Sequence, residues 1–435
     1  MKGKTLKLYI ISVFLGGLTG LIASLFQAAI VQLNGGLSSL YAFVDQHNWP
    51  TGLLSAVISM LMVFIAWLSV QYIAPEASGS GVPEIEGTLL HVRPIFWRRL
   101  IPVKFFSGIL SISAKMVVGR EGPTIQMGGN LGAMLGELFK LTRHRCDTLI
   151  AAGSAAGLAA AFNAPLAGVL FVMEEMRNQF NYSFTNFKMV VITCVMATIT
   201  LNICVGSQPA IQMQLFDLPS LSSLWFFLVF GIIVGLVGLI FNIGLMWTLE
   251  QLDKFSSKFK LLYVLLVGLL VGYLARLYPP TVGGGYEIIS QALTLSPSIS
   301  ILFLLLVIRF FTTLICYSTS VPGGIFAPML ALGTLLGLAA FHLFHWMTMD
   351  MSIQPGMFAV AGMGALFAAT VRSPITGVIL VVEMTQNYSL ILPLMITCIT
   401  STTVVQLANN KPIYTQLLER TLRLEKKKAV NRPLE

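Results

Sequence analysis

Charged side chains are scarce in this chain. Of its 435 residues only 10% are Asp, Glu, Lys or Arg, whereas 56% are hydrophobic, and its mean hydropathy is +0.81. Soluble globular proteins carry about 25% charged residues, so most of this surface cannot face water. The composition excludes an ordinary soluble protein and predicts one that is surrounded by lipid.

Cysteine is scarce as well, with five residues in the whole chain. They are scattered, most of them in or beside apolar runs, and no spacing among them is typical of a disulfide framework or a zinc site. The sequence also has no HExxH, GxSxG or Walker motif, which argues against an intramembrane enzyme. We therefore expect no bound metal and no cofactor.

Long apolar runs are abundant. A helix needs about 20 apolar residues to cross a bilayer, and runs of this kind recur along the sequence. We predict an all-α polytopic membrane protein in which residues 1–420 form a single transmembrane domain and residues 421–435 form a short basic cytoplasmic tail, with no soluble domain. The clearest runs are Leu8–Val31, Leu53–Ile73, Met189–Val205, Leu224–Trp247, Leu261–Tyr278 and Ile301–Leu314.

The net charge of +9 is concentrated toward the two ends of the chain. The first apolar run follows three lysines, but it is longer than the core of a signal peptide and no convincing cleavage site follows it. By the positive-inside tendency, both termini are expected on the cytoplasmic side. The charge therefore does not require a nucleic-acid partner. The basic residues are Lys2, Lys4 and Lys7, and then Lys411, Arg420, Arg423, Lys426, Lys427, Lys428 and Arg432.

The interior of the chain is duplicated. Residues 153–174 align without gaps with residues 362–383, and residues 119–132 align with residues 324–337. Duplicated halves with Gly- and Pro-interrupted segments in matching places are typical of secondary transporters. The residues alone do not say whether the halves are parallel or inverted. The two halves cover about residues 8–206 and 222–408.

Three segments have Gly at their start and Pro a few residues later: GSGVP at 79–83, GREGP at 119–123 and GGIFAP at 323–328. Gly tolerates an irregular approach to a helix, and Pro fits the first turn. A helix that begins inside the membrane leaves its first N–H groups unpaired, which is costly unless a partner is present. Together with the helix dipole, these groups predict a site for a small anion. Gly and Pro that only kink or pack helices are the alternative.

These motifs, in this order, resemble those of the CLC family of chloride channels and chloride/proton antiporters. The tyrosine of NKPIYTQLL, Tyr414, is a fourth match, and the similarity runs from Tyr72 to Arg420. The resemblance implies a fold of two inverted, structurally related halves with many tilted and partial helices. It also implies a homodimer with one anion pathway per subunit, in a bacterial inner membrane.

The resemblance further implies which residues bind the anion. A central chloride ion would be held by two hydroxyls and two backbone amides, and a second site nearer the outside would use the amides of the GREGP segment. Serine at position 80 favours chloride over nitrate, although the local sequence also allows Ser80 to be an ordinary helix cap. The central site would comprise Ser80, Ile325, Phe326 and Tyr414, and the outer site would include Arg120 and Gly122.

Glu121 lies at a helix start whose amides would also accept chloride. Its carboxylate is a tethered anion, so it should compete with chloride for one site. When deprotonated it closes the pathway; when protonated it loses the charge that holds it there and admits chloride. Glu121 would thus be the external gate and proton acceptor. A structural ion pair with Arg120 or Lys104 is the alternative.

Glu175 matches the internal proton-transfer glutamate of the family, a position that is usually apolar in the passive channels. It favours an electrogenic chloride/proton exchanger over the alternative, a voltage- or pH-gated chloride channel of the same fold. Taken alone, Glu175 could instead pair with Arg177. Glu174 and its repeat partner Glu383 are expected to be structural. For Glu86, a structural role and a pair with Lys104 are both open.

Overall fold

A computed structural model describes residues 2–177, 179–180, 182–295, 298–348 and 354–430. Within these ranges the regular structure consists of helices, and a single isolated β-bridge joins two loops. The α-helices are α1 (Lys2–Gln46), α2 (Thr51–Tyr72), α3 (Val82–Leu89), α4 (Trp97–Ser113), α5 (Glu121–Leu138), α6 (Arg143–Phe162), α7 (Pro165–Glu174), α8 (Phe184–Val205), α9 (Leu224–Asp253), α10 (Ser257–Leu277), α11 (Tyr286–Leu295), α12 (Ile299–Ser318), α13 (Phe326–Thr348), α14 (Pro355–Val371), α15 (Pro374–Thr385), α16 (Ile391–Leu407) and α17 (Ile413–Val430).

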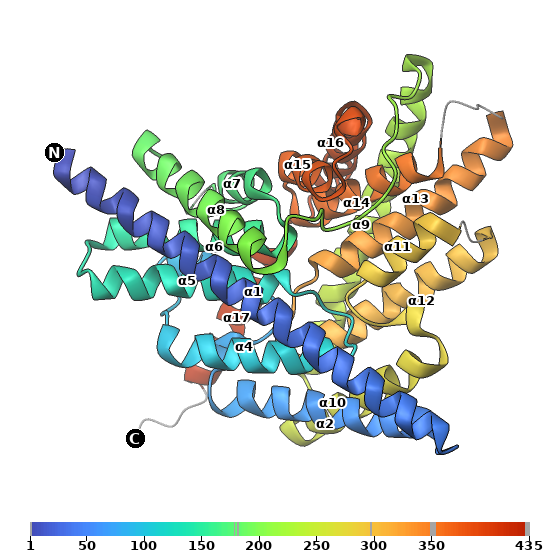
Figure 1. Ribbon diagram of the computed structural model, residues 1–435, viewed down its shortest axis with the longest axis horizontal. Helices are drawn as coiled ribbons and strands as arrows, with labels where there is room; N and C mark the ends of the chain where they lie inside the picture. Colours follow the sequence, from blue (N-terminus) through green and yellow to red (C-terminus); the bar gives the residue numbers. More distant parts are fainter. Residues whose placement is uncertain (1, 178, 181, 296–297, 349–353, 431–435) are drawn as a thin grey trace.

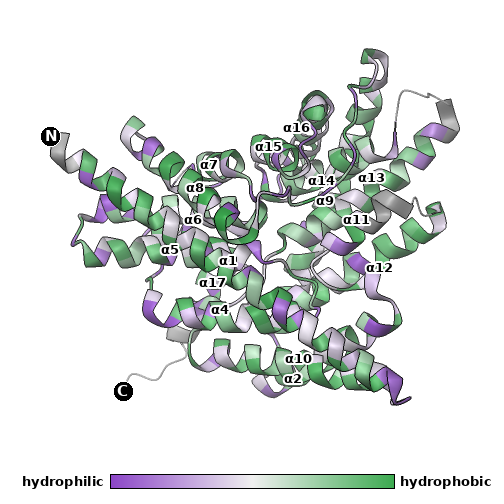
Figure 2. Ribbon diagram, viewed as in Figure 1, coloured by the Kyte–Doolittle hydropathy of each residue, from purple (hydrophilic) through white to green (hydrophobic). Residues whose placement is uncertain are grey.

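Long apolar helices dominate the molecule. Eight helices in the described part of the chain are long and apolar enough to cross a membrane, and α7, α14 and α15 are shorter apolar helices. Hydrophobic residues run along most of the helices, and polar ones gather toward helix ends and loops (Figure 2). The six apolar runs predicted from the sequence lie in α1, α2, α8, α9, α10 and α12. The prediction of an all-α fold with many partial helices is confirmed.

The two halves meet at aligned residues. Gly119 and Gly324, which the repeat alignment pairs, form the isolated antiparallel bridge. The N–H of Gly119 donates to the carbonyl of Gly324 (2.7 Å), and the N–H of Gly324 donates back to Gly119 (2.8 Å). A reciprocal pair of this kind between equivalent residues is what a two-fold relation between the halves requires.

A second reciprocal contact fixes the direction of the halves. Glu174, at the end of α7, accepts hydrogen bonds from the first amides of α15, those of Ile375 (3.1 Å) and Thr376 (2.6 Å). Glu383, near the end of α15, accepts from the first amides of α7, at Leu166 (3.1 Å) and Ala167 (2.8 Å). The two helices are therefore antiparallel neighbours, and the halves are inverted. The expected structural role of both glutamates is confirmed.

Small residues let the helices of each half pack closely. Gly128 of α5 lies against Gly153 of α6, and in the second half Gly333 of α13 lies against Gly362 of α14; at each position a Cβ atom would overlap the facing backbone. Figure 1 shows α5 beside α6 in one half and α13 beside α14 in the other. Close packing of this kind is common between membrane helices.

The C-terminal part of the described chain is one continuous helix. The domain boundary predicted at residue 420 falls inside α17, which runs on to Val430. Residues 431–435, and with them the expected basic residue Arg432, lie outside the described residues.

Candidate functional site

Four helices begin close to one another in the interior. α3 starts after Gly81, α5 at Glu121, α13 at Phe326 and α17 at Ile413. Hydrogen bonds tie the approach segments together, because the N–H of Gly323 donates to the carbonyl of Gly79 (3.0 Å) alongside the 119–324 bridge. Glycine is required at position 81, where φ is +83° and a Cβ atom would overlap Gln126. The helix starts predicted from Gly and Pro are confirmed.

Two buried hydroxyls meet at this point. Ser80 and Tyr414 are almost completely buried, and neither Ser80 Oγ nor Tyr414 Oη has a hydrogen-bond partner within the described structure. They lie close enough to interact, and Ser80 packs directly on Gly122. The cap of α3 is Gly81, without a side-chain hydrogen bond, so Ser80 is not an ordinary helix cap. Buried hydroxyls normally have a partner, which makes this pair suited to a bound acceptor such as an anion.

The start of α13 lies against the same hydroxyls. Ile325 and Phe326 are fully buried, and their N–H groups have no backbone partner among the described residues. The Phe326 ring stacks on the Tyr414 ring at 6.0 Å, and it contacts three more phenylalanines of the core, Phe162, Phe171 and Phe367. This packing places the start of α13 against the Tyr414 ring, and Gly323, just before it, bonds to Gly79 next to Ser80. The four residues expected at the central site are thus brought together.

Glu121 is fully buried at the start of α5. Its Oε1 accepts a hydrogen bond from the Tyr286 hydroxyl (2.6 Å), while Oε2 has no hydrogen-bond partner in the described part of the chain. The carboxylate lies over Gly119 and interacts with the backbone amide of Ala327 in α13. It therefore occupies the space between two helix starts, where an anion would also be stabilised.

The alternative of a structural ion pair for Glu121 is not supported. Neither Arg120 nor Lys104 forms an ion pair with it among those found in the described residues. Lys104 is fully buried, and its Nζ donates instead to the carbonyls of Ala77 (2.9 Å) and Gly79 (2.7 Å). The pairing of Lys104 with Glu86 is also wrong, because the loop carbonyls take the ammonium. Lys104 thus fixes the loop that carries Ser80.

Glu175 directly follows the last residue of α7, Glu174. Its Oε2 accepts a hydrogen bond from Ser373 (3.0 Å), and its carboxyl group interacts with that of Glu86. No ion pair between Glu175 and the exposed Arg177 is found in the described chain. Glu175 therefore has polar partners drawn from both halves, rather than a local salt bridge.

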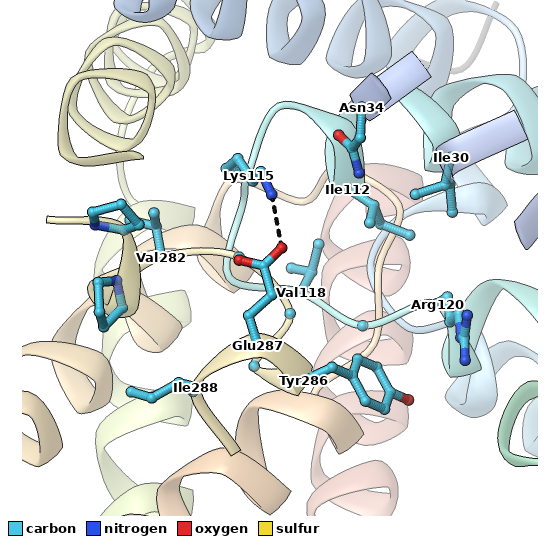
Figure 3. A pocket seen from close by; sticks show the side chains of 16 residues that line it. Ile30, Asn34, Ile112, Lys115, Val118, Arg120, Val282, Tyr286, Glu287 and Ile288 are labelled. Carbon is cyan, nitrogen blue, oxygen red and sulfur yellow. Dashed lines mark hydrogen bonds and ion pairs between the residues drawn. The ribbon is translucent and has the colours of Figure 1, made fainter. Parts of the chain in front are cut away.

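Two cavities are lined by residues of this region. One cavity, of about 160 Å³, is lined by Lys115, Gly119, Arg120, Tyr286 and Glu287 among others. In Figure 3 the ion pair between Lys115 and Glu287 crosses this cavity, and Arg120 and Tyr286 lie together at one end of it. A second cavity, of about 60 Å³, is lined by residues that include Ser80, Tyr317 and Arg420. Arg120, next to Glu121 in the sequence, thus lines the first cavity, and Ser80 lines the second.

Sequence reasoning missed two residues of the site. Tyr286 touches Glu121 from 165 positions away, and Ser373 touches Glu175 from 198 positions away. The run of three glycines directly before Tyr286 is the signal that could have drawn attention to it, since such a run often marks close backbone approach. Ser373 carries no comparable signal beyond its place before Pro374.

A family model described as "Voltage gated chloride channel" matches residues 62–406. The curated "H(+)/Cl(-) exchange transporter ClcA" of Vibrio parahaemolyticus is 44% identical over 433 residues, covering 98% of this chain and 92% of that protein. The protein of the same name from Salmonella arizonae is 42% identical over 424 residues, covering 96% and 89%.

Solved structures agree with these matches. The structure of a slow cyanobacterial Cl-/H+ antiporter superposes with a TM-score of 0.92 at 40% identity, covering 96% of this chain and 98% of that one. A CLC-type fluoride/proton antiporter superposes with a TM-score of 0.76 at 20% identity, covering 96% and 98%. The second likeness bears on the fold alone.

Proposed function

This chain belongs to the voltage gated chloride channel family, and from that premise we propose that it is a secondary active transporter that exchanges chloride for protons across a membrane. The observation that carries the proposal is the fully buried Glu121 carboxylate, seated between the starts of α5 and α13. A carboxylate in that position competes with chloride. When Glu121 takes up a proton it leaves this position, and chloride can bind in its place. The same carboxyl group therefore links the movements of the two ions.

The exchange cycle follows from this competition. When Glu121 is charged, it fills the outer anion position and closes the pathway. When it takes up a proton, it loses its attraction to the helix amides and moves away, and chloride enters. Chloride moving one way and protons the other both carry charge in the same electrical sense. The cycle is therefore electrogenic, and a membrane potential drives it with about 2.3 kcal/mol per charge per 100 mV.

The anion sites are assigned as follows. The central chloride is held by the hydroxyls of Ser80 and Tyr414 and by the amides of Ile325 and Phe326. The outer site uses the amides of the segment from Arg120 to Gly122. The free hydroxyls and amides at these places support the assignment. The bound chloride ions are the substrate, and the proposal includes no cofactor, no metal and no enzymatic step.

Glu175 is assigned the transfer of protons between the inner solution and Glu121. Its hydrogen bond to Ser373 and its interaction with Glu86 support a polar environment in which a proton can reside. Relatives at 44% and 42% identity are named as H(+)/Cl(-) exchange transporters, which favours exchange over the alternative of a passive chloride channel.

The assembly and orientation are also proposed. We infer a homodimer in a bacterial inner membrane, with one pathway per subunit and both termini in the cytoplasm. The basic residues near the two ends of the chain support this orientation. Its partners are then chloride, protons, lipid and a second copy of the chain, and no nucleic acid.

Proton uptake by chloride-loaded liposomes tests the exchange. Purified protein is reconstituted, a potassium ionophore sets the voltage, and external pH is followed with an electrode. We expect downhill chloride efflux to pull protons inward against their gradient. Glu175→Gln, which keeps the shape of the side chain but cannot be ionised, should stop proton movement and leave chloride movement.

The controls separate an exchanger from a passive channel and test the role of Glu175. Arg177→Gln, an exposed neighbour of Glu175, should keep both fluxes. Chloride efflux without uphill proton uptake in the unmodified protein would establish a channel and overturn the exchanger. Uphill proton uptake that survives Glu175→Gln would leave the exchanger standing and remove Glu175 from its role.

A further inference from the structure

The gate carboxylate is held by a residue of the opposite half. Tyr286 begins α11 in the second half, and its hydroxyl donates a 2.6 Å hydrogen bond to Oε1 of Glu121 in the first half. The other carboxylate oxygen has no hydrogen-bond partner within the described residues. This hydroxyl is therefore the side-chain donor that fixes the position of the carboxylate.

The backbone before Tyr286 is anchored on three sides. Arg309 of α12 is fully buried, and its guanidinium donates to the carbonyls of Pro280 (2.8 Å), Val282 (3.0 Å) and Gly283 (2.8 Å). The N–H of Gly283 donates to the carbonyl of Lys115 (2.8 Å) in the loop before α5. These bonds connect the approach to Tyr286 with the loop that leads to the gate.

Gly285 supplies the third anchor. Its φ is +110°, and a Cβ atom there would lie 2.6 Å from Cβ of Ala331 and 3.2 Å from the carbonyl of Ala327 in α13. The chain thus presses directly on the helix whose start faces the gate carboxylate. With its backbone held by α12, α13 and the 115 loop, Tyr286 has a fixed base from which to reach Glu121.

Among the described residues, few charged groups lie near the hydrogen bond between Tyr286 and Glu121. Arg120 lies over the Tyr286 ring, 5.2 Å from its centroid, and acts on Glu121 through its charge, while α13 contributes the amide of Ala327. Lys115 and Glu287 pair with each other in the same cavity. Arg120 and Tyr286 line that cavity as well.

We propose that Tyr286 is a positioning residue that latches the gate: its hydroxyl stabilises Glu121 in the closed position and so limits how fast the exchange cycle runs. This inference rests on the proposed function of Glu121 as the gate. A hydrogen bond donated to a carboxylate favours its charged form over its neutral form. The latch therefore holds best when the gate is charged, and opening requires that the bond be given up.

Removing the hydroxyl should release the gate. In Tyr286→Phe the ring remains and the hydrogen bond is lost, which for a bond to a charged group changes an equilibrium about tenfold or more. We expect faster chloride and proton fluxes at neutral pH and an activity profile that moves toward higher pH by roughly one pH unit, since a tenfold change corresponds to one unit. The ratio of chloride to protons should stay unchanged.

The experiment compares fluxes from liposomes across a pH series for the unmodified protein, Tyr286→Phe and Tyr263→Phe. Tyr263 is the matched control, because its hydroxyl bonds Ser318 (2.8 Å) and the carbonyl of Ile315 (3.1 Å) away from the gate. It should leave the pH profile in place. Tyr286→Leu, which lacks both hydroxyl and ring, is a second test of the latch, and it too should give faster fluxes.

A gate-deleted background separates positioning from structure. If Tyr286 acts through Glu121, Tyr286→Phe should not change chloride flux in a Glu121→Ala protein. The latch would be overturned if Tyr286→Phe changed chloride flux equally with and without Glu121. It would also be overturned if neither Tyr286 variant altered the rates or the pH profile. Chloride rates alone decide this comparison, so a missing uphill proton flux in the unmodified protein would reject the exchanger without affecting the result.

Discussion

The hydroxyls of Ser80 and Tyr414 differ from most other hydroxyls of the helices in their hydrogen bonding. Most hydroxyls in the helices donate to the carbonyl of the preceding turn, as Thr313 does to Arg309 (2.6 Å). The hydroxyls of Ser80 and Tyr414 do not bond any described protein group, and the Tyr414 ring stacks on Phe326 at the start of α13. Removing either hydroxyl therefore breaks no hydrogen bond of the protein itself.

This distinction gives a prediction for Ser80→Ala and Tyr414→Phe. Each should weaken chloride binding about 5- to 10-fold, the effect of one hydrogen bond worth about 1 kcal/mol, while the midpoint of thermal unfolding without chloride stays nearly unchanged. Titration calorimetry with chloride and thermal unfolding in detergent measure the two quantities. Tyr263→Phe should do the reverse, with lower stability and unchanged affinity. Unchanged affinity in both site variants would remove these hydroxyls from the anion site.

At the scale of elements, short helices are joined in pairs by their ends. The carboxylate at the end of α7 caps the start of α15, and the carboxylate near the end of α15 caps the start of α7. Each cap satisfies two amides that would otherwise be unpaired and places negative charge at the positive end of a helix. Each of the two helices therefore stabilises the start of the other.

We therefore expect Glu174→Ala and Glu383→Ala to destabilise the protein by similar amounts. Loss of a charged cap at a partly buried helix start costs about 1–3 kcal/mol, which thermal unfolding in detergent would register as an earlier midpoint. Glu419→Ala is the control, because its ion pair with Lys411 is exposed on both sides, 48% and 59%, and such pairs contribute about 0–1 kcal/mol. Midpoints for the cap variants that match the control would show that the caps contribute little.

Local features of the sequence predicted elements better than contacts between them. Gly and Pro act on their own backbone, so the starts of α5 and α13 could be placed within a residue or two. The contact of Tyr286 with Glu121 depends on how α11 packs on α13 and how Arg309 holds the preceding loop, which no local pattern encodes. The alternative that Glu86 pairs with Lys104 failed for a related reason, since loop carbonyls distant in sequence compete for the ammonium.

At the scale of the whole molecule, the repeat determines the architecture. The alignment of the two halves predicted a duplicated fold. It did not predict whether the halves are parallel or inverted, because sequence similarity is the same in both cases. The structure supplies the missing information through contacts between equivalent residues, at Gly119 with Gly324 and at the paired caps. Equivalent helices consequently lie together: α15 contacts α7, and α8 and α16 flank them (Figure 1).

The outer faces of α8 and α16 are where we expect the second copy of the chain. Val195, Ile199 and Ile203 form an exposed apolar row on α8, and Leu392, Met395 and Ile399 form one on α16. An apolar row can face either lipid or a second subunit. Only a packed subunit interface requires complementary shape, so a bulky substitution distinguishes the two. A Trp in place of Ile199 fits against lipid, but it overfills a packed interface, which typically costs about 1–3 kcal/mol.

Counting subunits tests this arrangement. Singly labelled protein at low density in bilayers should bleach in two steps, and Ile199→Trp should shift the population toward one step. Ile240→Trp, on an exposed face of α9, is the control and should keep two. If each subunit has its own pathway, the monomeric variant should still exchange chloride at a similar rate per chain. One-step bleaching of the unmodified protein would rule out the homodimer, whereas a dimer broken by Ile240→Trp and not by Ile199→Trp would move the interface to α9.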